Sequence, residues 1–328
     1  MDEPVCAVLR HTAFFYRGQR EYAAGIVAFI RAGLAAGEPA LLALPGGKPR
    51  AIGDRLDDVP GEVAFTDMAE LGRNPARIIP ELRAFTDKHP GQRVRYVGEP
   101  IWPGRSAAEI CEATRHEALV NLAFAQAPIA ILCPYEASGL TGSVLTGARR
   151  THQEPAATGA TGHTWRDNLP PECDRPLDPP PAEAEALAYD TNLAPVRQLV
   201  RGYARHAGLS AERTVDLVLA ANEIAANTIA HTTGSGVLHV WHTPEEVVCQ
   251  VHDQGEITDP LAGRVRNGPD NRGHGLWLVN QVCDLVELRT RRAGTTVRMH
   301  MRRVPEPAPA VGPLGLPSGR RCPRPPPF

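Results

Sequence analysis

The sequence predicts two folded domains of different class: an α/β domain with a doubly wound, mostly parallel sheet, and an α+β two-layer sandwich. Over residues 6–150, short apolar segments alternate with helical patterns, which is typical of a parallel sheet. Over residues 183–303, helices come first and paired strands follow, which favours an antiparallel sheet with one covered face. Residues 151–182 are rich in Pro, Gly, Thr and Ala without an apolar period, and predict a linker. The Pro-rich residues 304–328 predict a disordered tail.

The α/β prediction depends on apolar strands separated by amphipathic helices. Tyr22, Ile26 and Ile30 fall on one stripe of a helix over residues 21–37, which Gly37 ends. The next segment, PALLALP, is short and apolar throughout, as in a strand that is buried on both faces. The expected strands cover residues 39–45, 61–67, 93–100 and 128–136, and further helices cover 74–89 and 106–126.

The second domain begins with an amphipathic helix over residues 193–209. Ser210 is placed to cap a long helix over 210–232. The following elements are strands over 237–243 and 245–253, a helix over 275–286, and strands over 286–292 and 294–303 around a turn at Ala293-Gly294.

Composition narrows the functional classes. The 328 residues are 42% hydrophobic and 22% charged, with a net charge of −2, so the chain has no basic footprint for nucleic acid. The seven cysteines are far apart and form no CxxC pair, which favours reduced thiols over a disulfide framework or a zinc site. The acidic N-terminus is no signal peptide, and no segment has the roughly 18 apolar residues of a membrane span. We expect a cytoplasmic protein without membrane contact.

Three motifs of the second domain occur in an order that suits ATP. Glu223 and Asn227, in NEIAAN, are four residues apart and share a helical face. An amide oxygen at Asn227 is a ligand for Mg²⁺, which bridges phosphates, and a carboxylate at Glu223 is placed to accept a proton from an attacking hydroxyl or water. Asp253, at a strand end, is able to accept a hydrogen bond from the exocyclic amine of adenine, and Gly255 lets the backbone approach the base.

The third motif is GHGL, residues 273–276, at the start of the predicted helix over 275–286. Gly273 and Gly275 allow backbone amides to face phosphate oxygens, and the N-terminal end of a helix favours negative charge. One such glycine pair is weak evidence alone, but here it follows NEIAAN and DQG.

Together these motifs resemble the GHKL ATPase (Bergerat) fold, and within it the branch of anti-sigma factors and serine-protein kinases. NEIAAN, with Asn222, is similar to the N-box, and DQG and GHGL are similar to the two glycine boxes. The resemblance covers about a third of the chain. It implies that Glu223 is the catalytic base, that Asn227 binds Mg²⁺ and that Asp253 reads adenine. It further implies that the phosphates are held by Gly273, His274, Gly275 and Leu276, with Gly255 and Thr296 near the adenine.

The first domain resembles the MEDS sensory domain in the segments HTAFFYRGQREYAAGIVAFIRAGLAAGEPALL, VGEPIW, RHEALVN and ILCPYE. The resemblance implies a RecA-like fold without a working P-loop. The segment LPGGKPR agrees, since Pro49 follows Lys48 where a P-loop has Ser or Thr, and Leu42 stands at the place of the leading glycine.

Several polar residues have simpler interpretations. Glu117 and Asn121 repeat the spacing of Glu223 and Asn227, but no glycine box follows, so we interpret them as an ordinary helix face. His116 beside Glu117 lies within an α/β domain rather than on a two-helix hairpin, which disfavours a phosphoacceptor role. We give His231 no metal role. Arg197 and Arg201, on the predicted helix over residues 193–209, form either a solvated face or a contact for an acidic partner.

The resemblance implies a cytoplasmic, ATP- and Mg²⁺-dependent serine/threonine-protein kinase of the anti-sigma type. It would phosphorylate an antagonist protein, sequester a sigma factor, or do both, under control of the N-terminal sensor. Its partners would be a sigma factor and/or an anti-anti-sigma protein, and a homodimer is left open. One alternative is a sensor histidine kinase, although the linker offers only His152 and His163 among prolines. Another is a nucleotide-dependent binding switch without turnover.

Overall fold

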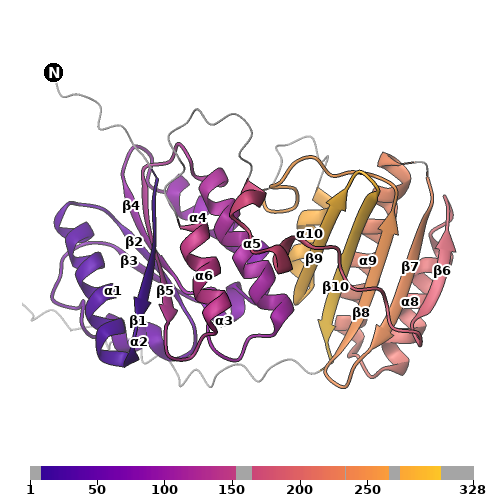
Figure 1. Cartoon of the computed structure of the whole chain (residues 1–328), viewed down its shortest axis with the longest axis horizontal. Helices are drawn as coiled ribbons and strands as arrows, with labels where there is room; N and C mark the ends of the chain where they lie inside the picture. Colours follow the sequence, from indigo (N-terminus) through magenta and orange to yellow (C-terminus); the bar gives the residue numbers. More distant parts are fainter. Residues whose placement is uncertain (1–8, 153–164, 233, 266–273, 304–328) are drawn as a thin grey trace, which may run out of the picture.

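The computed structural model describes residues 9–152, 165–232, 234–265 and 274–303 of the chain. These residues form two five-stranded sheets with their own helices, which lie side by side along the long axis of the molecule (Figure 1). One sheet is parallel and the other antiparallel, which confirms the two predicted fold classes. The predicted disordered tail lies outside the described residues.

The N-terminal sheet has the order β1-β5-β4-β2-β3, and all of its pairs are parallel. Leu42 and Leu44 of β2 pack with α1 and α2 on one face, whereas Leu41 and Ala43 pack with α4 and α5 on the other. Burial on both faces explains why this strand is apolar throughout. The strands are β1 (Arg10–Tyr16), β2 (Ala40–Leu44), β3 (Val63–Asp67), β4 (Val94–Gly98) and β5 (Ile129–Glu136). The helices are α1 (Gly18–Ala35), α2 (Lys48–Gly53), α3 (Met68–Leu71), η1 (Pro75–Arg77), α4 (Ile78–Asp87), α5 (Ala107–Ala123) and α6 (Gly142–Thr151).

The C-terminal sheet has the order β6-β7-β8-β10-β9 and is antiparallel. Three helices cover one face and share an apolar core with the strands (Figure 1). The strands are β6 (Glu185–Tyr189), β7 (Gly236–His242), β8 (Glu246–Asp253), β9 (Leu285–Arg291) and β10 (Gly294–Arg302), and the helices are α8 (Ala194–His206), α9 (Ala211–His231) and α10 (His274–Val282).

Part of the predicted linker is structured. It contains η2 (Trp165–Asn168) and α7 (Pro171–Asp174), in which Cys173 is buried. Arginine side chains hold this segment against both domains, because Arg115 Nη1 donates to the Cys173 carbonyl at 3.1 Å and Arg289 Nε donates to the Arg175 carbonyl at 3.2 Å. These hydrogen bonds use backbone oxygens, so no apolar period marks the segment in the sequence.

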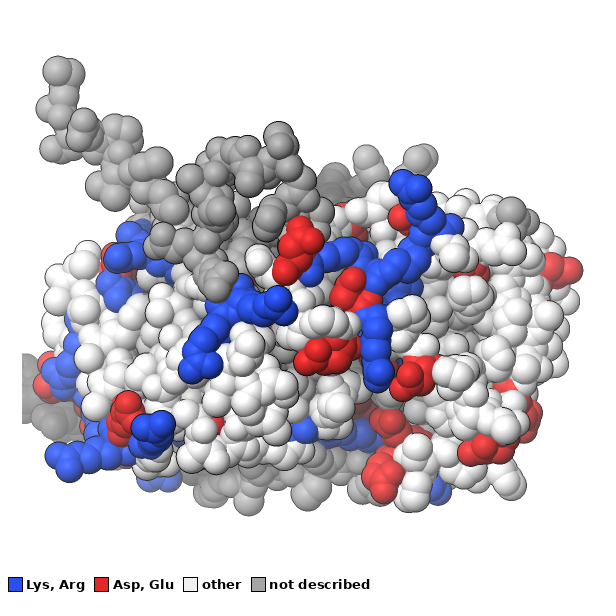
Figure 2. Space-filling model, in the orientation of Figure 1, with Lys and Arg blue, Asp and Glu red and all other residues white. Residues whose placement is uncertain are grey.

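The face drawn in Figure 2 carries side chains of both charge signs near the junction of the two domains, rather than a patch of one sign. Among the described residues, no helix has the length and apolar content needed to cross a membrane.

Candidate functional site

Helices α9 and α10 bring the first and third predicted motifs together. The Ser210 hydroxyl caps α9 by accepting from the Arg213 amide at 3.3 Å, and Glu223 and Asn227 lie one turn apart further along the helix. Gly275 is the second residue of α10. A Cβ on Gly275 would lie 3.0 Å from Glu223 Oε2 and 3.2 Å from Asn227 Nδ2, closer than ordinary van der Waals contact. This close approach explains the glycine and makes the three residues one site.

The Glu223 carboxylate and the Asn227 amide are half-buried, and neither has a hydrogen bond or ion pair to another described residue. Their neighbour Asn222 points elsewhere, since its Oδ1 accepts from Arg197 of α8 at 2.9 Å. The site therefore offers a carboxylate and an amide oxygen beside the N-terminal end of a helix. These are the hard oxygen donors that Mg²⁺ takes, next to a helix end that favours phosphate, so the residues present fit a magnesium nucleotide.

The Asp253 carboxylate is held in a fixed orientation at the end of β8. Its Oδ2 accepts from Thr228 Oγ1 at 2.7 Å, and its Oδ1 accepts from the Gly255 amide at 2.8 Å. Thr228 accepts in turn from the Tyr189 hydroxyl at 2.9 Å. Burial raises the pKa of Tyr189 to about 12, so its hydroxyl remains a donor at neutral pH. Each carboxylate oxygen still has a lone pair for a ligand.

Gly255 and Gly294, near Asp253, have no room for a side chain because a threonine side chain or the backbone lies against them. A Cβ on Gly255 would lie 2.6 Å from Thr232 Cγ2. Gly294 has φ +134° at the turn into β10, and a Cβ there would lie 2.2 Å from the Asp253 carbonyl oxygen. The sequence predicts Gly294 as a turn residue, and the structure adds its close approach to the backbone of Asp253.

The threonine beside Asp253 is Thr295 rather than the predicted Thr296. In the β8–β10 pair, Thr295 lies opposite Asp253 and Thr296 lies opposite His252. Thr295 is buried and donates to the Gly255 carbonyl at 2.8 Å, whereas Thr296 Oγ1 lies 3.0 Å from His252 Nδ1 on the other face of the sheet. Neighbouring strand residues point to opposite faces, so a displacement of one residue moves the side chain away from the site.

The remaining predicted residues differ in their surroundings. His274 begins α10, and its buried Nδ1 has no hydrogen-bond partner within the described ranges. Leu276 is buried in the apolar core, where it anchors α10. Gly273 lies outside the described residues. Thr228 was missed, although it directly follows Asn227 in the sequence.

The N-terminal domain holds the far end of α10. Arg77 of η1 donates to the carbonyl oxygens of Asn280 at 2.8 Å, Gln281 at 2.6 Å and Cys283 at 2.8 Å. The end of a helix leaves such carbonyls without intrahelical partners and favours positive charge. Arg77 therefore fixes the helix whose first turn carries Gly275.

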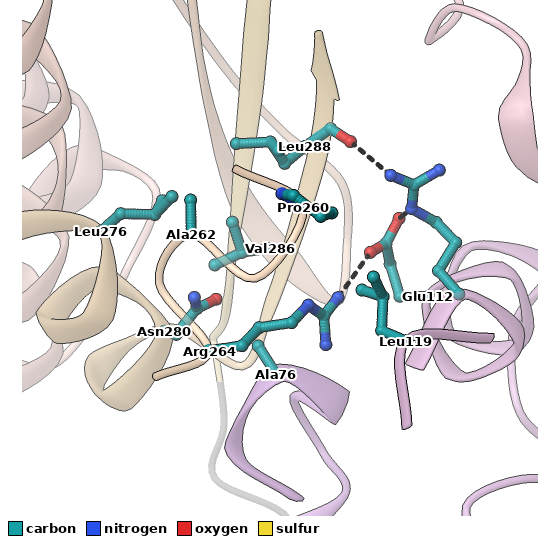
Figure 3. A pocket seen from close by; sticks show the side chains of 11 residues that line it. Ala76, Glu112, Leu119, Pro260, Ala262, Arg264, Leu276, Asn280, Val286 and Leu288 are labelled. Atoms are coloured by element: carbon teal, nitrogen blue, oxygen red, sulfur yellow. Dashed lines mark hydrogen bonds and ion pairs between the residues drawn. The ribbon is translucent and has the colours of Figure 1, made fainter. Parts of the chain in front are cut away.

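The same domain also contacts the loop before α10, through the buried Glu112 of α5. The Glu112 carboxylate accepts from Arg289 Nη1 at 2.6 Å and lies 3.6 Å from Arg115 Nε and 3.7 Å from Arg264 Nη2. Figure 3 shows Glu112 and Arg264 at a cavity between the domains. Its volume of about 30 Å³ holds no more than about one water molecule, so this cavity is not a nucleotide site.

Comparison with known protein families gives one match for each of the two domains. Residues 10–153 match the family described as MEDS, "MEthanogen/methylotroph, DcmR Sensory domain", and residues 187–301 match the family described as "Histidine kinase-like ATPase domain". Among solved structures, the chain is similar to the RsbU and RsbW domains of Rv1364c from Mycobacterium tuberculosis, with 18% identity and a TM-score of 0.28.

That similarity covers 36% of this chain and 32% of the other, so the chain spans about a third of the length of that relative. A search of curated proteins gives no match. The family of the second domain implies ATP binding. This chain therefore carries a MEDS sensory domain followed by a histidine kinase-like ATPase domain of the GHKL type.

Proposed function

We propose that the chain is an ATP-dependent serine/threonine-protein kinase of the anti-sigma type, which phosphorylates an antagonist protein, sequesters a sigma factor, or does both. The observation that carries the proposal is the approach of Gly275 to the free side chains of Glu223 and Asn227, with an oriented Asp253 on the neighbouring sheet. In this proposal Asn227 is the ligand of the cation and Glu223 is the general base, as phosphoryl transfer from ATP requires. The helix end at Gly275 contacts the phosphates, and Asp253 recognises adenine.

Each residue has a distinct role in the proposed reaction. Asp253 accepts a hydrogen bond from the exocyclic amine of adenine, and Thr295 supports the backbone at Gly255. Asn227 holds Mg²⁺, which neutralises charge on the phosphates when it is bound. Glu223 accepts the proton of the substrate hydroxyl while that oxygen bonds to the γ-phosphorus and the bond to the β-phosphate oxygen breaks. The first turn of α10, with Gly273 beside it, positions the phosphates.

The N-terminal domain is placed to control this site. It contacts the loop before residues 266–273 through Glu112 and Arg264, and the end of α10 through Arg77. Residues 266–273 are therefore flanked on both sides in the sequence by residues that contact the N-terminal domain. A movement of η1 or α5 relative to the ATPase domain would change the position of α10, and with it the space around Gly275.

The sensor itself follows a RecA-like arrangement that has lost its phosphate loop, in our proposal. Lys48 of GGKP is already paired, because its Nζ lies 2.6 Å from Oε1 of the buried Glu99. Tyr16 and Tyr22 each donate to the same carboxylate at 2.9 Å. Lys48 thus balances an internal charge, and we expect no nucleotide to bind there.

Two alternatives make different predictions. A histidine kinase needs an accessible acceptor histidine on a helical hairpin, whereas His152 is enclosed beside Glu117 at the end of α6. His163, the other candidate, lies outside the described residues. A binding switch would hold ATP without consuming it, so turnover in the presence of the partner separates it from the kinase.

The test uses the full chain with Mg²⁺ and γ-labelled ATP, together with a protein that co-purifies with it from the host. We expect ATP to bind in preference to GTP, and the label to reach a serine or threonine of the partner. Glu223→Gln should retain ATP binding and lose transfer. Glu212→Gln, an exposed carboxylate in the first turn of the same helix, is the matched control and should transfer normally. Full transfer by Glu223→Gln would remove Glu223 from its role, and absence of ATP binding would refute the proposal as a whole. The same preparation, analysed by mass in solution, tests for a homodimer.

A further inference from the structure

Four buried side chains of the N-terminal domain converge on one point. They are His11 of β1, Glu117 of α5, Cys133 of β5 and His152, which caps the end of α6. Glu117 Oε2 lies 2.9 Å from His11 Nε2, 3.2 Å from His152 Nε2 and 3.3 Å from Cys133 Sγ. All four ligand atoms lie within 4.8 Å of one another, and the side chains of Glu117 and both histidines are no more than 3% exposed.

The surrounding hydrogen bonds fix which ring nitrogens face this point. Asn121 Nδ2 donates to the Thr151 carbonyl at 2.8 Å, so its Oδ1 is turned toward His11 and accepts from Nδ1 at 2.9 Å. His152 Nδ1 lies 2.7 Å from the Ala148 carbonyl, which is an acceptor only. Both Nδ1 atoms therefore carry protons, and in neutral imidazoles both Nε2 atoms present lone pairs to the centre.

The hydrogen bonds among these side chains leave two buried polar atoms without a partner. His152 Nε2 and Glu117 Oε1 are buried without a hydrogen-bond partner among the described residues. If each Nε2 carried a proton to donate to the carboxylate, two imidazolium rings would stand 4.0 Å apart with one carboxylate between them. Two like charges at that distance in a buried site are unfavourable.

We propose that His11, Glu117, Cys133 and His152 bind a divalent transition metal, with Zn²⁺ as the ion that this donor set suits best. Two imidazole nitrogens, one thiolate and one carboxylate are a tetrahedral zinc set, with bonds of roughly 2.0–2.3 Å. Ligands at such bond lengths stand about 3.3–3.8 Å apart, so the observed separations need only small side-chain shifts. The thiol and carboxylate, once deprotonated, balance the charge of the ion.

The hydrogen bonds around the four side chains resemble those that orient the ligands of a metal site. Metal-ligating histidines usually donate their second ring nitrogen to a carbonyl or carboxylate, which fixes the ring, and both histidines here do so to an oxygen. The four ligands come from four separate elements, so a bound ion would join β1, β5, α5 and α6. Since the cluster contains none of the residues assigned to ATP, it stands or fails independently of the proposed kinase activity.

The experiment is a titration of the reduced full chain, freed of metal by chelation and without nucleotide, with Co²⁺ as the spectroscopic probe. We expect one equivalent to bind, with the visible bands of tetrahedral cobalt and a thiolate-to-cobalt charge-transfer band, and Zn²⁺ to displace it at equal stoichiometry. Cys133→Ser should lose the charge-transfer band. Cys249→Ser removes an equally buried thiol of the ATPase domain and should retain it.

A second variant keeps the proposal testable if Cys133→Ser fails to fold. Asn121→Ala leaves all four ligands in place but removes the support of His11, and should weaken metal affinity about 10- to 100-fold. Absence of stoichiometric binding, or an unchanged spectrum in Cys133→Ser, would overturn the proposal and leave a polar core held by hydrogen bonds. Loss of cobalt binding in Asn227→Ala would also overturn it, because the ion would then belong to the ATPase domain.

Discussion

Replacing Gly275 by alanine should separate nucleotide binding from folding. Gly275 has no positive φ, so alanine fits its helical backbone and gains up to about 1 kcal/mol of helix propensity. The added Cβ, however, would lie 3.0 Å from Glu223 Oε2 and 3.2 Å from Asn227 Nδ2. It occupies space beside the two side chains that we propose to face the nucleotide. Both contacts are with the ends of flexible side chains, which can turn away from the added Cβ in the free protein but then lose their positions for the nucleotide. A loss of about 1–3 kcal/mol of binding energy from misplaced polar groups is roughly 5- to 150-fold in Kd for Mg-ATP.

The assay is calorimetric titration with Mg-ATP, together with urea unfolding of the same preparations. Gly202→Ala is the matched control, because Gly202 lies exposed in α8 and a Cβ there meets nothing within 4 Å. Both variants should be as stable as the parent or slightly more stable, and only Gly275→Ala should bind nucleotide weakly. Parental affinity in Gly275→Ala, or an equal loss of stability and binding, would refute the assignment of GHGL to the nucleotide site.

Three further predictions test separate contacts. Asp253→Asn should reduce the preference for ATP over GTP by roughly tenfold or more in competition binding, because the charged acceptor for the adenine amine is lost. Burial opposes charge on His300, but hydrogen bonds to Glu246 and Glu287 raise its pKa to about 9, so it contributes stability, at most about 3 kcal/mol, below pH 6.5 that is lost as the pH rises through 9. Urea unfolding should show this loss in the parent and not in His300→Gln. Glu112→Gln leaves buried arginines uncompensated and should cost about 3–5 kcal/mol in the unfolding free energy.

Each of these has an outcome that contradicts it. An unchanged nucleotide preference in Asp253→Asn would place the adenine elsewhere. A parallel pH dependence of His300→Gln and the parent would mean that other groups set the alkaline loss. A Glu112→Gln chain as stable as the parent would show that the interface does not depend on that carboxylate.

The sequence predicted the interior of the fold better than its edges. The central strands and the long helices were visible because burial on both faces, or on one stripe, leaves a clear apolar period, as in PALLALP. The strands β1 (Arg10–Tyr16) and β6 (Glu185–Tyr189) were not predicted as strands. Both are edge strands in which only the last residue, Tyr16 or Tyr189, is fully buried. Each therefore has only a four-residue apolar stretch, AFFY or ALAY, without the strict alternation that marks a half-buried strand.

The candidate site was predictable as far as it depends on motif order. Glu223 and Asn227 share a face of α9 because the spacing of helix residues is regular. Their closeness to Gly275 of α10 was expected from the order of the motifs, and the structure shows it. The sequence alone did not distinguish Thr296 from Thr295, which lies opposite Asp253, because the strand register that orients two adjacent threonines depends on pairing with β8. The cysteine spacing argued against a zinc site, whereas the four proposed ligands are brought together only by the fold.

Helix α5 links the proposed metal site to the ATPase domain, which leads to a last prediction. Glu112 and Glu117 are five residues apart, so at about 100° per residue they point to nearly opposite sides of the helix. Glu117 faces the four-ligand cluster, and Glu112 faces Arg264 and Arg289 of the ATPase domain. An ion that draws Glu117 toward the other ligands would shift α5, and with it the contact to the loop before α10. If the two sites are coupled in this way, Zn²⁺ must change the affinity for Mg-ATP by the same factor by which Mg-ATP changes the affinity for Zn²⁺. Measuring both affinities in the parent and in Glu112→Gln decides the question: the reciprocal factor should fall to one in the variant while metal still binds, and a factor of one in the parent would refute the coupling through α5.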